Sequence, residues 1–280
     1  MMYISSDAQL IKSKVFSELH SQPGIFVIPN PWDAGSARIL ATLGFKALAT
    51  TSAGLAFSLG KPDGAGTISR YEALTNAAII NSATSLPVSA DLENGYGDEP
   101  EACAGTVLVA AKAGIAGCSI EDATNRPGSP IYAFEHAVER IGAAVAAARS
   151  LPFPFTLTAR AENLIHGRPD LHDTIRRLEA FAAAGADVLY APGLRTLQEI
   201  ETVVRAVAPK PVNVLMGLNG VNITVNQLAD LGVKRISIGS ALARAAYGSF
   251  LRGAQEISDT GTFAFAEDAV PYAHFNAMFM

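Results

Sequence analysis

Short apolar runs rich in β-branched residues alternate along the chain with longer segments whose apolar positions recur every three to four residues. The short runs predict strands and the longer segments predict helices, since these are the periods that side chains follow on the two elements. Eight strands are expected, at residues 25–28, 47–51, 88–92, 118–122, 156–160, 188–191, 212–216 and 236–239. Each is followed by an expected helix, at residues 34–43, 71–82, 101–113, 135–148, 171–184, 197–207, 224–231 and 241–256.

Regular alternation of strands and helices predicts a parallel sheet with right-handed crossovers. Eight such units in roughly 250 residues predict an α/β fold of the (β/α)8 barrel type, with an open doubly wound sheet as the alternative. We expect a single barrel domain over residues 1–280, with the barrel at about 24–257, a helix at 8–20 before it and a helical extension at about 258–280. The last eight residues are too apolar for an exposed segment, so we expect them to pack on their own barrel or against another subunit.

The composition of the chain argues against some classes of binding partner. Among 280 residues, 49% are hydrophobic and the net charge is −5, which argues against a nucleic-acid or anionic-membrane surface. The N-terminus lacks a basic segment followed by an apolar one, and no apolar run reaches the ~18 residues of a membrane span. We therefore expect a soluble, cytoplasmic protein. Cys103 and Cys118 lack metal-ligand spacing and are expected to be small buried hydrophobes.

Acidic residues stand where two successive strands end. Asp91 and Glu93 close one apolar run, and Glu121 with Asp122 closes the next. Active sites of barrels lie at this edge of the sheet, and side chains two apart on a strand should point to the same side. Oxygen donors alone favour Mg²⁺, with Mn²⁺ possible, whereas the five histidines lack the spacing of a zinc site.

Two further segments suit an acidic ligand. Residues 50–64 are expected to be a loop after the second strand, and Ser52, Ala53 and Gly54 within it are small, so a substrate oxygen can approach the main chain closely there. Arg160 ends the fifth strand, and its planar guanidinium fits a carboxylate with two hydrogen bonds. An internal ion pair of Arg160 with Glu162 or Glu121 is the alternative.

Together these residues resemble the isocitrate lyase and phosphoenolpyruvate mutase superfamily. The resemblance is carried by residues 88–97, VSADLENGYG, by Ser119-Ile120-Glu121-Asp122 and by Ala159-Arg160, within a match from about Pro29 to Ser240. It implies a Mg²⁺-dependent (β/α)8 enzyme that acts on 2-oxo-carboxylates or related acids through enolates. It also implies a homo-oligomer, a tetramer or dimer, in which the last barrel helix is swapped between subunits.

The resemblance also implies a role for each matching residue. Asp91, Glu93 and Glu121 would hold the metal, and Asp63 would support its water shell. The substrate's oxygens would be received by Ser52, Ala53, Gly54 and Leu55, and its carboxylate by Arg160.

The segment after Glu121-Asp122 departs from the family pattern. Lyases of the family carry a loop with a catalytic cysteine there, and mutases carry a lysine directly after the acidic pair, but this chain continues with Ala123 and has no cysteine in residues 123–132. Without that acid, cleavage of a carbon–carbon bond in a 2-oxo acid, such as decarboxylation of oxaloacetate, is the expected reaction. Tyr190 and His166 are the candidate proton donors. The alternatives are P–C bond chemistry, of the phosphonomutase or phosphonopyruvate hydrolase type, and a non-catalytic 2-oxo-acid binding protein.

Overall fold

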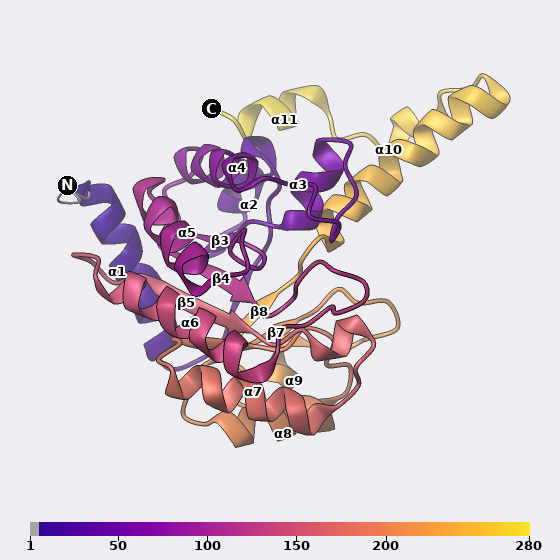
Figure 1. Cartoon of the computed structure of the whole chain (residues 1–280). Helices are drawn as coiled ribbons and strands as arrows, with labels where there is room; N and C mark the ends of the chain where they lie inside the picture. The colour runs from indigo at the N-terminus through magenta and orange to yellow at the C-terminus, as the bar shows by residue number, and fades with distance from the viewer. Residues whose placement is uncertain (1–5) are drawn as a thin grey trace.

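Eight parallel strands form the centre of the molecule in the structure, a computed structural model that describes residues 6–280 (Figure 1). The strands are β1 (Phe26–Ile28), β2 (Leu48–Ala49), β3 (Val88–Asp91), β4 (Gly117–Glu121), β5 (Thr156–Arg160), β6 (Val188–Tyr190), β7 (Val212–Leu215) and β8 (Arg235–Ser237). Their order is β1-β8-β7-β6-β5-β4-β3-β2, so β2 to β8 each pair with their neighbours in sequence, and β8 also pairs with β1. This is the predicted (β/α)8 barrel.

The two ends of the sheet, β1 and β2, meet through single hydrogen bonds. The Ala49 N–H donates to the Pro29 carbonyl at 3.1 Å, and the Asn30 side-chain amide donates to the Thr50 carbonyl at 2.9 Å. Asn30 Oδ1 in turn accepts from the N–H groups of Ile238 and Gly239, just beyond β8. Asn30 thus ties three strand ends together at the edge of the barrel where a site is expected.

Helices surround the strands. They are α1 (Asp7–Ser21), α2 (Ala34–Thr42), α3 (Ser52–Ser58), α4 (Arg70–Ser82), α5 (Pro100–Lys112), α6 (Phe134–Arg149), α7 (Leu171–Ala183), α8 (Leu197–Val207), α9 (Val225–Asp230), α10 (Ala241–Thr260) and α11 (Tyr272–Ala277). Two 3₁₀ turns, η1 (Asn163–His166) and η2 (Ala264–Asp268), complete the set. Among residues 6–280, no helix combines the length and the apolar character that crossing a membrane requires.

Side-chain caps explain where several helices begin. Asp33 accepts from the Ser36 N–H at the start of α2, and Thr196 accepts from the Glu199 N–H at the start of α8. In both helices the third residue returns a bond to the cap, which satisfies backbone donors that a helix start leaves open. Because such capping residues can be recognised in the sequence, the predicted helix boundaries differ from the observed ones by only a few residues.

Helix α1 closes the end of the barrel at which the strands begin. Its Phe16 and His20 are buried, and the His20 ring lies edge-on to Phe16 and to Phe26 of β1. The two cysteines, Cys103 and Cys118, are buried as predicted. Phe16 and Phe26 belong to a small apolar cluster at this end of the barrel, separate from the main core that contains both cysteines.

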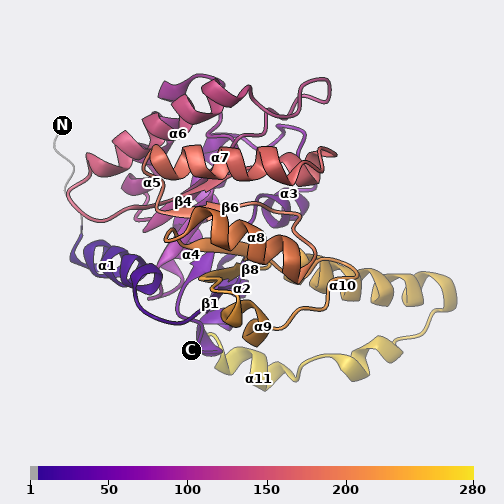
Figure 2. The ribbon, with the colours of Figure 1, turned by 90° about the horizontal axis from the view of Figure 1, so that it is seen from below.

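The C-terminal segment projects from the barrel. Helix α10 extends away from the strands in both views, and the chain then returns through η2 and α11 (Figures 1 and 2). Large apolar side chains on this segment are exposed, including Phe250 at 73%, Phe263 at 65% and Tyr272 at 84%. The helical character of the extension is confirmed, but most of its apolar surface lacks cover from its own barrel.

Two local expectations were wrong. Residues 52–58 were expected to be part of a loop, yet they form α3, with Thr51 as its cap. Strand β3 ends at Asp91, and Glu93 adopts a left-handed φ of 46°, so Asp91 and Glu93 do not follow strand alternation. The turn that follows β3 therefore begins at Glu93, and Tyr96 also takes a positive φ.

Candidate active site

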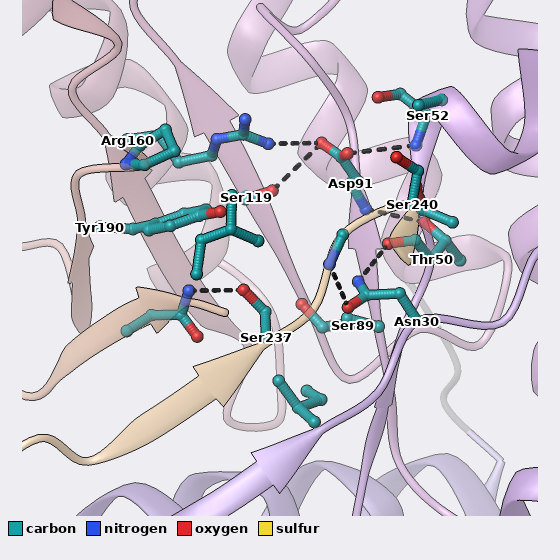
Figure 3. A pocket seen from close by; sticks show the side chains of 18 of the residues that line it. Asn30, Thr50, Ser52, Ser89, Asp91, Ser119, Arg160, Tyr190, Ser237 and Ser240 are labelled. Carbon is teal, nitrogen blue, oxygen red and sulfur yellow. Dashed lines mark hydrogen bonds and ion pairs between the residues drawn. The ribbon is translucent and has the colours of Figure 1, made fainter. Parts of the chain in front are cut away.

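A cavity of about 170 Å³ opens at the carboxyl ends of the strands (Figure 3). It is smaller than the roughly 300 Å³ or more of typical drug-sized ligand pockets, so it suits a small ligand. Most of the residues that line it are polar: Asn30, Thr50, Thr51, Ser52, Asp63, Ser89, Asp91, Ser119, Arg160, Tyr190, Asn213, Arg235, Ser237 and Ser240. The site therefore occupies the barrel position that the sequence predicts.

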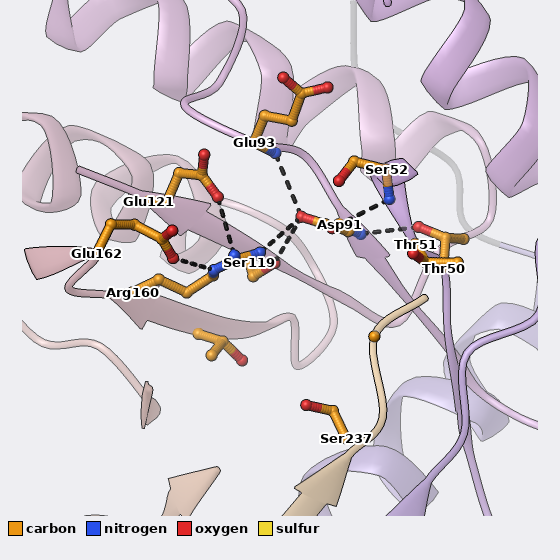
Figure 4. Close-up of polar contacts among 12 residues, drawn as sticks. Thr50, Thr51, Ser52, Asp91, Glu93, Ser119, Glu121, Arg160, Glu162 and Ser237 are labelled. Atoms are coloured by element: carbon orange, nitrogen blue, oxygen red, sulfur yellow. Dashed lines mark hydrogen bonds and ion pairs between the residues drawn. The ribbon is translucent and has the colours of Figure 1, made fainter. Parts of the chain in front are cut away.

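Arg160 lies among three carboxylates at the mouth of the cavity (Figure 4). Its Nε donates to Glu162 Oε1 at 2.9 Å, its Nη1 to Asp91 Oδ1 at 3.0 Å, and its Nη2 lies 3.2 Å from Glu121 Oε2. Burial alone would lower the pKa of Arg160, but these three acids hold it well above its usual value. The internal ion pair weighed as the alternative for Arg160 is present, and it coexists with a place in the cavity wall.

The acids around Arg160 outnumber it. Burial, together with repulsion from Asp91 and Asp63, raises the pKa of Glu93 to about 7. Burial likewise raises the pKa of Asp63, again with a contribution from Asp91. Burial also raises the pKa of Glu121, although Arg160 opposes the shift. Positive charge in addition to that of Arg160 would therefore be needed to keep all of these acids ionised.

Asp91 is held in place by the neighbouring strand β2 and by α3. Its N–H donates to Thr50 Oγ1 at 2.8 Å, and its Oδ2 accepts from the Ser52 N–H at 3.2 Å. Ser119 Oγ donates to Asp91 Oδ1 at 3.5 Å. These contacts position the carboxylate at the cavity wall, where Figure 3 places it between Arg160 and Ser52.

The structure distributes the three candidate metal ligands unequally. Asp91 lines the cavity, Glu121 lies behind Arg160, and Glu93 lies in a neighbouring hollow, where its Oε2 is 3.4 Å from Asn125 Nδ2. Across residues 6–280, no three His, Cys, Asp or Glu side chains are already grouped as a metal site. Donor chemistry nevertheless suits a divalent cation, because an excess of buried carboxylates is stabilised by positive charge.

Only some of the candidate substrate-binding residues line the cavity. Ser52 and Ala53 line the cavity, whereas Gly54 and Leu55 are buried behind them. A Cβ at Gly54 would lie 2.6 Å from Thr51 Cγ2 and 2.9 Å from Trp32 Cβ, so only glycine fits there without a shift. The small residues thus bring the start of α3 close to the cavity.

Tyr190, at the end of β6, lines the cavity beside Arg160. The Arg160 guanidinium lies 5.0 Å from the centre of the Tyr190 ring. Burial raises the pKa of Tyr190 to about 12, with Arg160 and a hydrogen bond with Ser237 opposing the rise. Tyr190 therefore keeps its proton at neutral pH. His166, the other candidate donor, is in η1 and lies 3.8 Å from Glu162 Oε2, outside the cavity lining.

The loop after Glu121-Asp122 folds back on itself. Ala123 forms an isolated antiparallel bridge with Ile131, and Arg126 pairs with Asp98 at 2.8 Å. Asp122 turns away from the cavity to a buried ion pair with Arg177 at 2.9 Å. This loop places no lysine or cysteine at the cavity, which agrees with the departure seen in the sequence.

Sequence reasoning missed the polar floor of the cavity. Asn213, Arg235 and Ser237 reach it from β7 and β8, and Thr158 lies beside them on β5. The available signal was an arginine at the start of an apolar strand, which the pattern alone does not distinguish from a surface residue.

Comparison with known proteins gives a consistent result. Residues 16–258 match the sequence model of the family described as phosphoenolpyruvate phosphomutase. A crystal structure from Burkholderia cenocepacia J2315, of a protein provisionally described as a lyase/mutase, is 58% identical, covers 98% of this chain and 97% of its own, and superimposes with a TM-score of 0.94. The structure of an oxaloacetate acetylhydrolase with its product oxalate is 29% identical, with 96% and 93% of the two chains covered and a TM-score of 0.86. The 2-methylisocitrate lyase of Aeropyrum pernix is 28% identical over 255 residues, which are 89% of this chain and 80% of the relative.

Proposed function

Because the chain belongs to the phosphoenolpyruvate mutase and isocitrate lyase superfamily and is an enzyme of that family, we propose that it cleaves a carbon–carbon bond of a small 2-oxo-carboxylate through an enolate. The observation that carries this proposal is the meeting of Arg160 with Asp91, Glu121 and Glu162 at the mouth of a small polar cavity. Such a site can bind an anionic acid and stabilise charge on its oxygen atoms.

The acids fit a divalent cation, Mg²⁺ first and Mn²⁺ second. Asp91 and Glu121 would hold it, directly or through water, with Glu93 and Asp63 supporting its water shell. A cation bound there would polarise the 2-oxo group of the substrate. Since Arg160 Nη1 and Nη2 now contact Asp91 and Glu121, a cation that took over these acids would leave the two nitrogens for a substrate carboxylate.

Three features of the chain would act on the substrate itself. Arg160 would bind its carboxylate, with the Nε contact to Glu162 fixing the plane of the guanidinium. Ser52 and Ala53 would approach its other oxygens, because both line the cavity. Tyr190 would hold a proton on Oη and give it to the carbon on which the enolate collapses, since its pKa of about 12 keeps it protonated.

Two bonds of oxaloacetate, the simplest such acid, could break in this way. If C3–C4 breaks, CO₂ leaves, the electron pair forms the enolate of pyruvate, and a proton at C3 completes pyruvate. If water first adds at C2, the hydrate loses a hydroxyl proton to solvent and C2–C3 breaks. The electron pair then forms the enolate of acetate, a proton at C3 completes acetate, and oxalate is the second product. Both routes need the same anion binding and the same proton donor.

P–C bond chemistry has less support from this chain. The position after Glu121-Asp122, a lysine in mutases of the family, is Ala123, and it is buried in its bridge to Ile131. The nearest basic residue of the loop, Arg126, pairs with Asp98 instead. We therefore place carbon–carbon cleavage first.

We also propose that the chain assembles into a dimer or tetramer by exchanging α10. Phe250, Leu251 and Tyr272 are exposed on the projecting C-terminal segment, and burial of such an apolar surface by a second copy would stabilise it. Light scattering should then give a mass of two or four chains, and a monomer at micromolar concentration would exclude the exchange.

Metal dependence is tested by Asp91→Asn, which removes one charge at the cavity wall and preserves shape. Calorimetric titration with Mg²⁺ should show binding to the wild type and at least ~10-fold weaker binding to the variant, with turnover of oxaloacetate lost in parallel. Asp187→Asn is the matched control, because Asp187 is a partly exposed acid that pairs with Arg149 away from the cavity. Full turnover by wild type after removal of metal with EDTA would overturn the metal assignment.

A further inference from the structure

Arg235 is a buried cation at the inner end of the cavity. It starts β8 and is 5% exposed. Across residues 6–280, no carboxylate lies within 4 Å of its guanidinium, in contrast to Arg160 and Arg177, which both pair with acids. Burial of a charge is costly unless an opposite charge compensates it. Arg235 therefore needs a separate explanation.

The partners of Arg235 are neutral hydrogen-bond acceptors. Its Nε donates to Asn213 Oδ1 at 2.8 Å, its Nη2 donates to Thr158 Oγ1 at 2.9 Å, and its Nη1 lies 3.2 Å from His20 Nε2. His20 Nδ1 lies 2.8 Å from the Phe16 carbonyl, which can only accept, so Nδ1 carries the proton and Nε2 accepts from Arg235. These three bonds use three of the five N–H donors of the guanidinium, and two remain for another acceptor.

Burial lowers the pKa of Arg235 to about 10; Arg160 lowers it as well, while Tyr190 raises it. The side chain thus stays charged at neutral pH. The neutral groups that accept its hydrogen bonds stabilise the charged guanidinium but bring no opposite charge to it.

The position of Arg235 relative to Arg160 fits a ligand with two anionic ends. Thr158, which Arg235 contacts, precedes Arg160 by two residues on β5, and two residues of a strand span ~6.6 Å. The two end carbons of a four-carbon acid, joined by three bonds of ~1.5 Å, are at most about 4 Å apart. With a hydrogen bond at each end, such a molecule can reach from the level of Arg160 toward Arg235.

The wall between the two arginines is polar. Asn213 Nδ2 donates to Ser237 Oγ at 2.9 Å, and Ser237 and Tyr190 both line the cavity. Figure 3 shows Ser237 on the same side of the cavity as Tyr190 and Arg160. A charged end group that passes along this wall would therefore keep polar neighbours.

We propose that Arg235 is a second anion-binding residue, which selects 2-oxo dicarboxylates by receiving the carboxylate remote from the 2-oxo group. This assignment rests on the proposed function, in which Arg160 binds the other end. A carboxylate held by Arg235 is restrained from leaving as CO₂. This subsite therefore favours cleavage of C2–C3, which keeps the remote carboxylate in the product, over cleavage of C3–C4.

The test compares three ligands by calorimetry in the presence of Mg²⁺. 3,3-Difluorooxaloacetate carries the remote carboxylate, 2-oxobutyrate has the same four-carbon chain without it, and oxalate is too short to reach Arg235. Arg235→Gln should weaken binding of the diacid about 10- to 100-fold, because one charged hydrogen-bonded contact is lost. The affinities for 2-oxobutyrate and oxalate should change less than about threefold. Arg235→Lys should recover part of the loss.

Arg149→Gln is the matched control. It makes the same substitution at an arginine that pairs with Asp187 and does not line the cavity, so diacid binding should be unchanged. If Arg235→Gln fails to fold, the wild type alone decides: the diacid should bind at least ~10-fold tighter than 2-oxobutyrate, and a difference below about threefold overturns the proposal.

The other outcomes separate this proposal from the proposed function. Equal losses for all three ligands would make Arg235 a structural residue and overturn the subsite. Binding of oxalate by wild type with no effect of Arg235→Gln on the diacid would overturn the subsite and leave the proposed function standing. Absence of binding of any of the three acids to wild type would overturn both.

Discussion

Arg160 on β5 and Asp91 on β3 form a 3.0 Å ion pair that joins two strands across an intervening third. Both side chains are mostly buried, with 13% and 16% of their surfaces exposed. The pair brings the candidate anion-binding residue into contact with the candidate metal ligand. Any change at one of these residues should therefore affect the other.

Replacement of Arg160 by lysine should weaken binding of a 2-oxo diacid. One ammonium cannot contact Glu162, Asp91 and Glu121 in the geometry of a planar guanidinium, so we expect KM to rise about 10- to 100-fold. Steady-state kinetics measures this. Arg177→Lys is the control, because Arg177 is equally buried in pairs with Asp122 and Asp173 but does not line the cavity. An unchanged KM in Arg160→Lys would assign Arg160 to structure.

Removal of the Tyr190 hydroxyl should slow the chemical step. Tyr190→Phe leaves the ring against Arg160 and removes the proton donor, so kcat should fall about 10²- to 10⁴-fold with little change in KM. Tyr132→Phe is the control. The hydroxyl that it removes contacts Asp98 and Asn94 away from the cavity, so kcat should not change. A kcat for Tyr190→Phe within threefold of wild type would exclude a role for this proton.

Alanine at Gly54 should disturb the start of α3. The added Cβ would lie 2.6 Å from Thr51 Cγ2 and 2.9 Å from Trp32 Cβ, and overpacking of this kind costs about 1–3 kcal/mol. Urea unfolding should show that loss, and KM should rise because Ser52 and Ala53 move. At Gly128, by contrast, a Cβ meets nothing within 4 Å, so Gly128→Ala should be neutral in both measurements. Equal stability of the two variants would refute the close packing at Gly54.

His20 should make the protein less stable in mild acid. Burial lowers its pKa from 6.5 to about 3, with Arg235 and Lys234 adding to the shift and the Phe16 carbonyl opposing it. The folded state then keeps His20 neutral while the unfolded chain takes up a proton below pH 6.5. The stabilisation is complete above that pH and is lost as pH falls toward 3, by about 1.4 kcal/mol for each pH unit.

Urea unfolding at pH 7 and pH 5.5 measures this effect. The free energy of unfolding should fall by about 1 kcal/mol more in wild type than in His20→Gln, which cannot titrate. Exposed His172 supplies the control, because His172→Gln should retain the wild-type difference. The burial argument fails if His20→Gln and wild type lose the same free energy between the two pH values.

Local periodicity was sufficient to predict the barrel. The strand at Thr156–Arg160 and the helix at Leu197–Val207 were predicted with their observed bounds, because each has a clear apolar pattern and a polar end. The short segment Ser52–Ser58 was missed as a helix because its small residues also suit a turn, and only the packing of Gly54 against Trp32 and Thr51 distinguishes the two.

The contents of the site were predictable only in part. Asp91 and Arg160 line the cavity, as their places at strand ends predict, since barrel sites lie at the carboxyl ends of the strands. The turn at Glu93 depends on positive φ values, which a glutamate in the sequence does not predict. The Arg235 network joins residues from α1, β5, β7 and β8, and contacts between such distant positions leave no trace in a local pattern.

We propose that this cavity binds a 2-oxo acid and that the enzyme cleaves a carbon–carbon bond in it. The most direct measurement follows loss of oxaloacetate and appearance of pyruvate and oxalate, with and without Mg²⁺, corrected for spontaneous decay, beside phosphonopyruvate and methylisocitrate. We predict Mg²⁺-dependent release of pyruvate or oxalate from oxaloacetate, abolished in Asp91→Asn, and no turnover of phosphonopyruvate. Turnover of phosphonopyruvate alone, or saturable binding of oxaloacetate without any product, would contradict the claim.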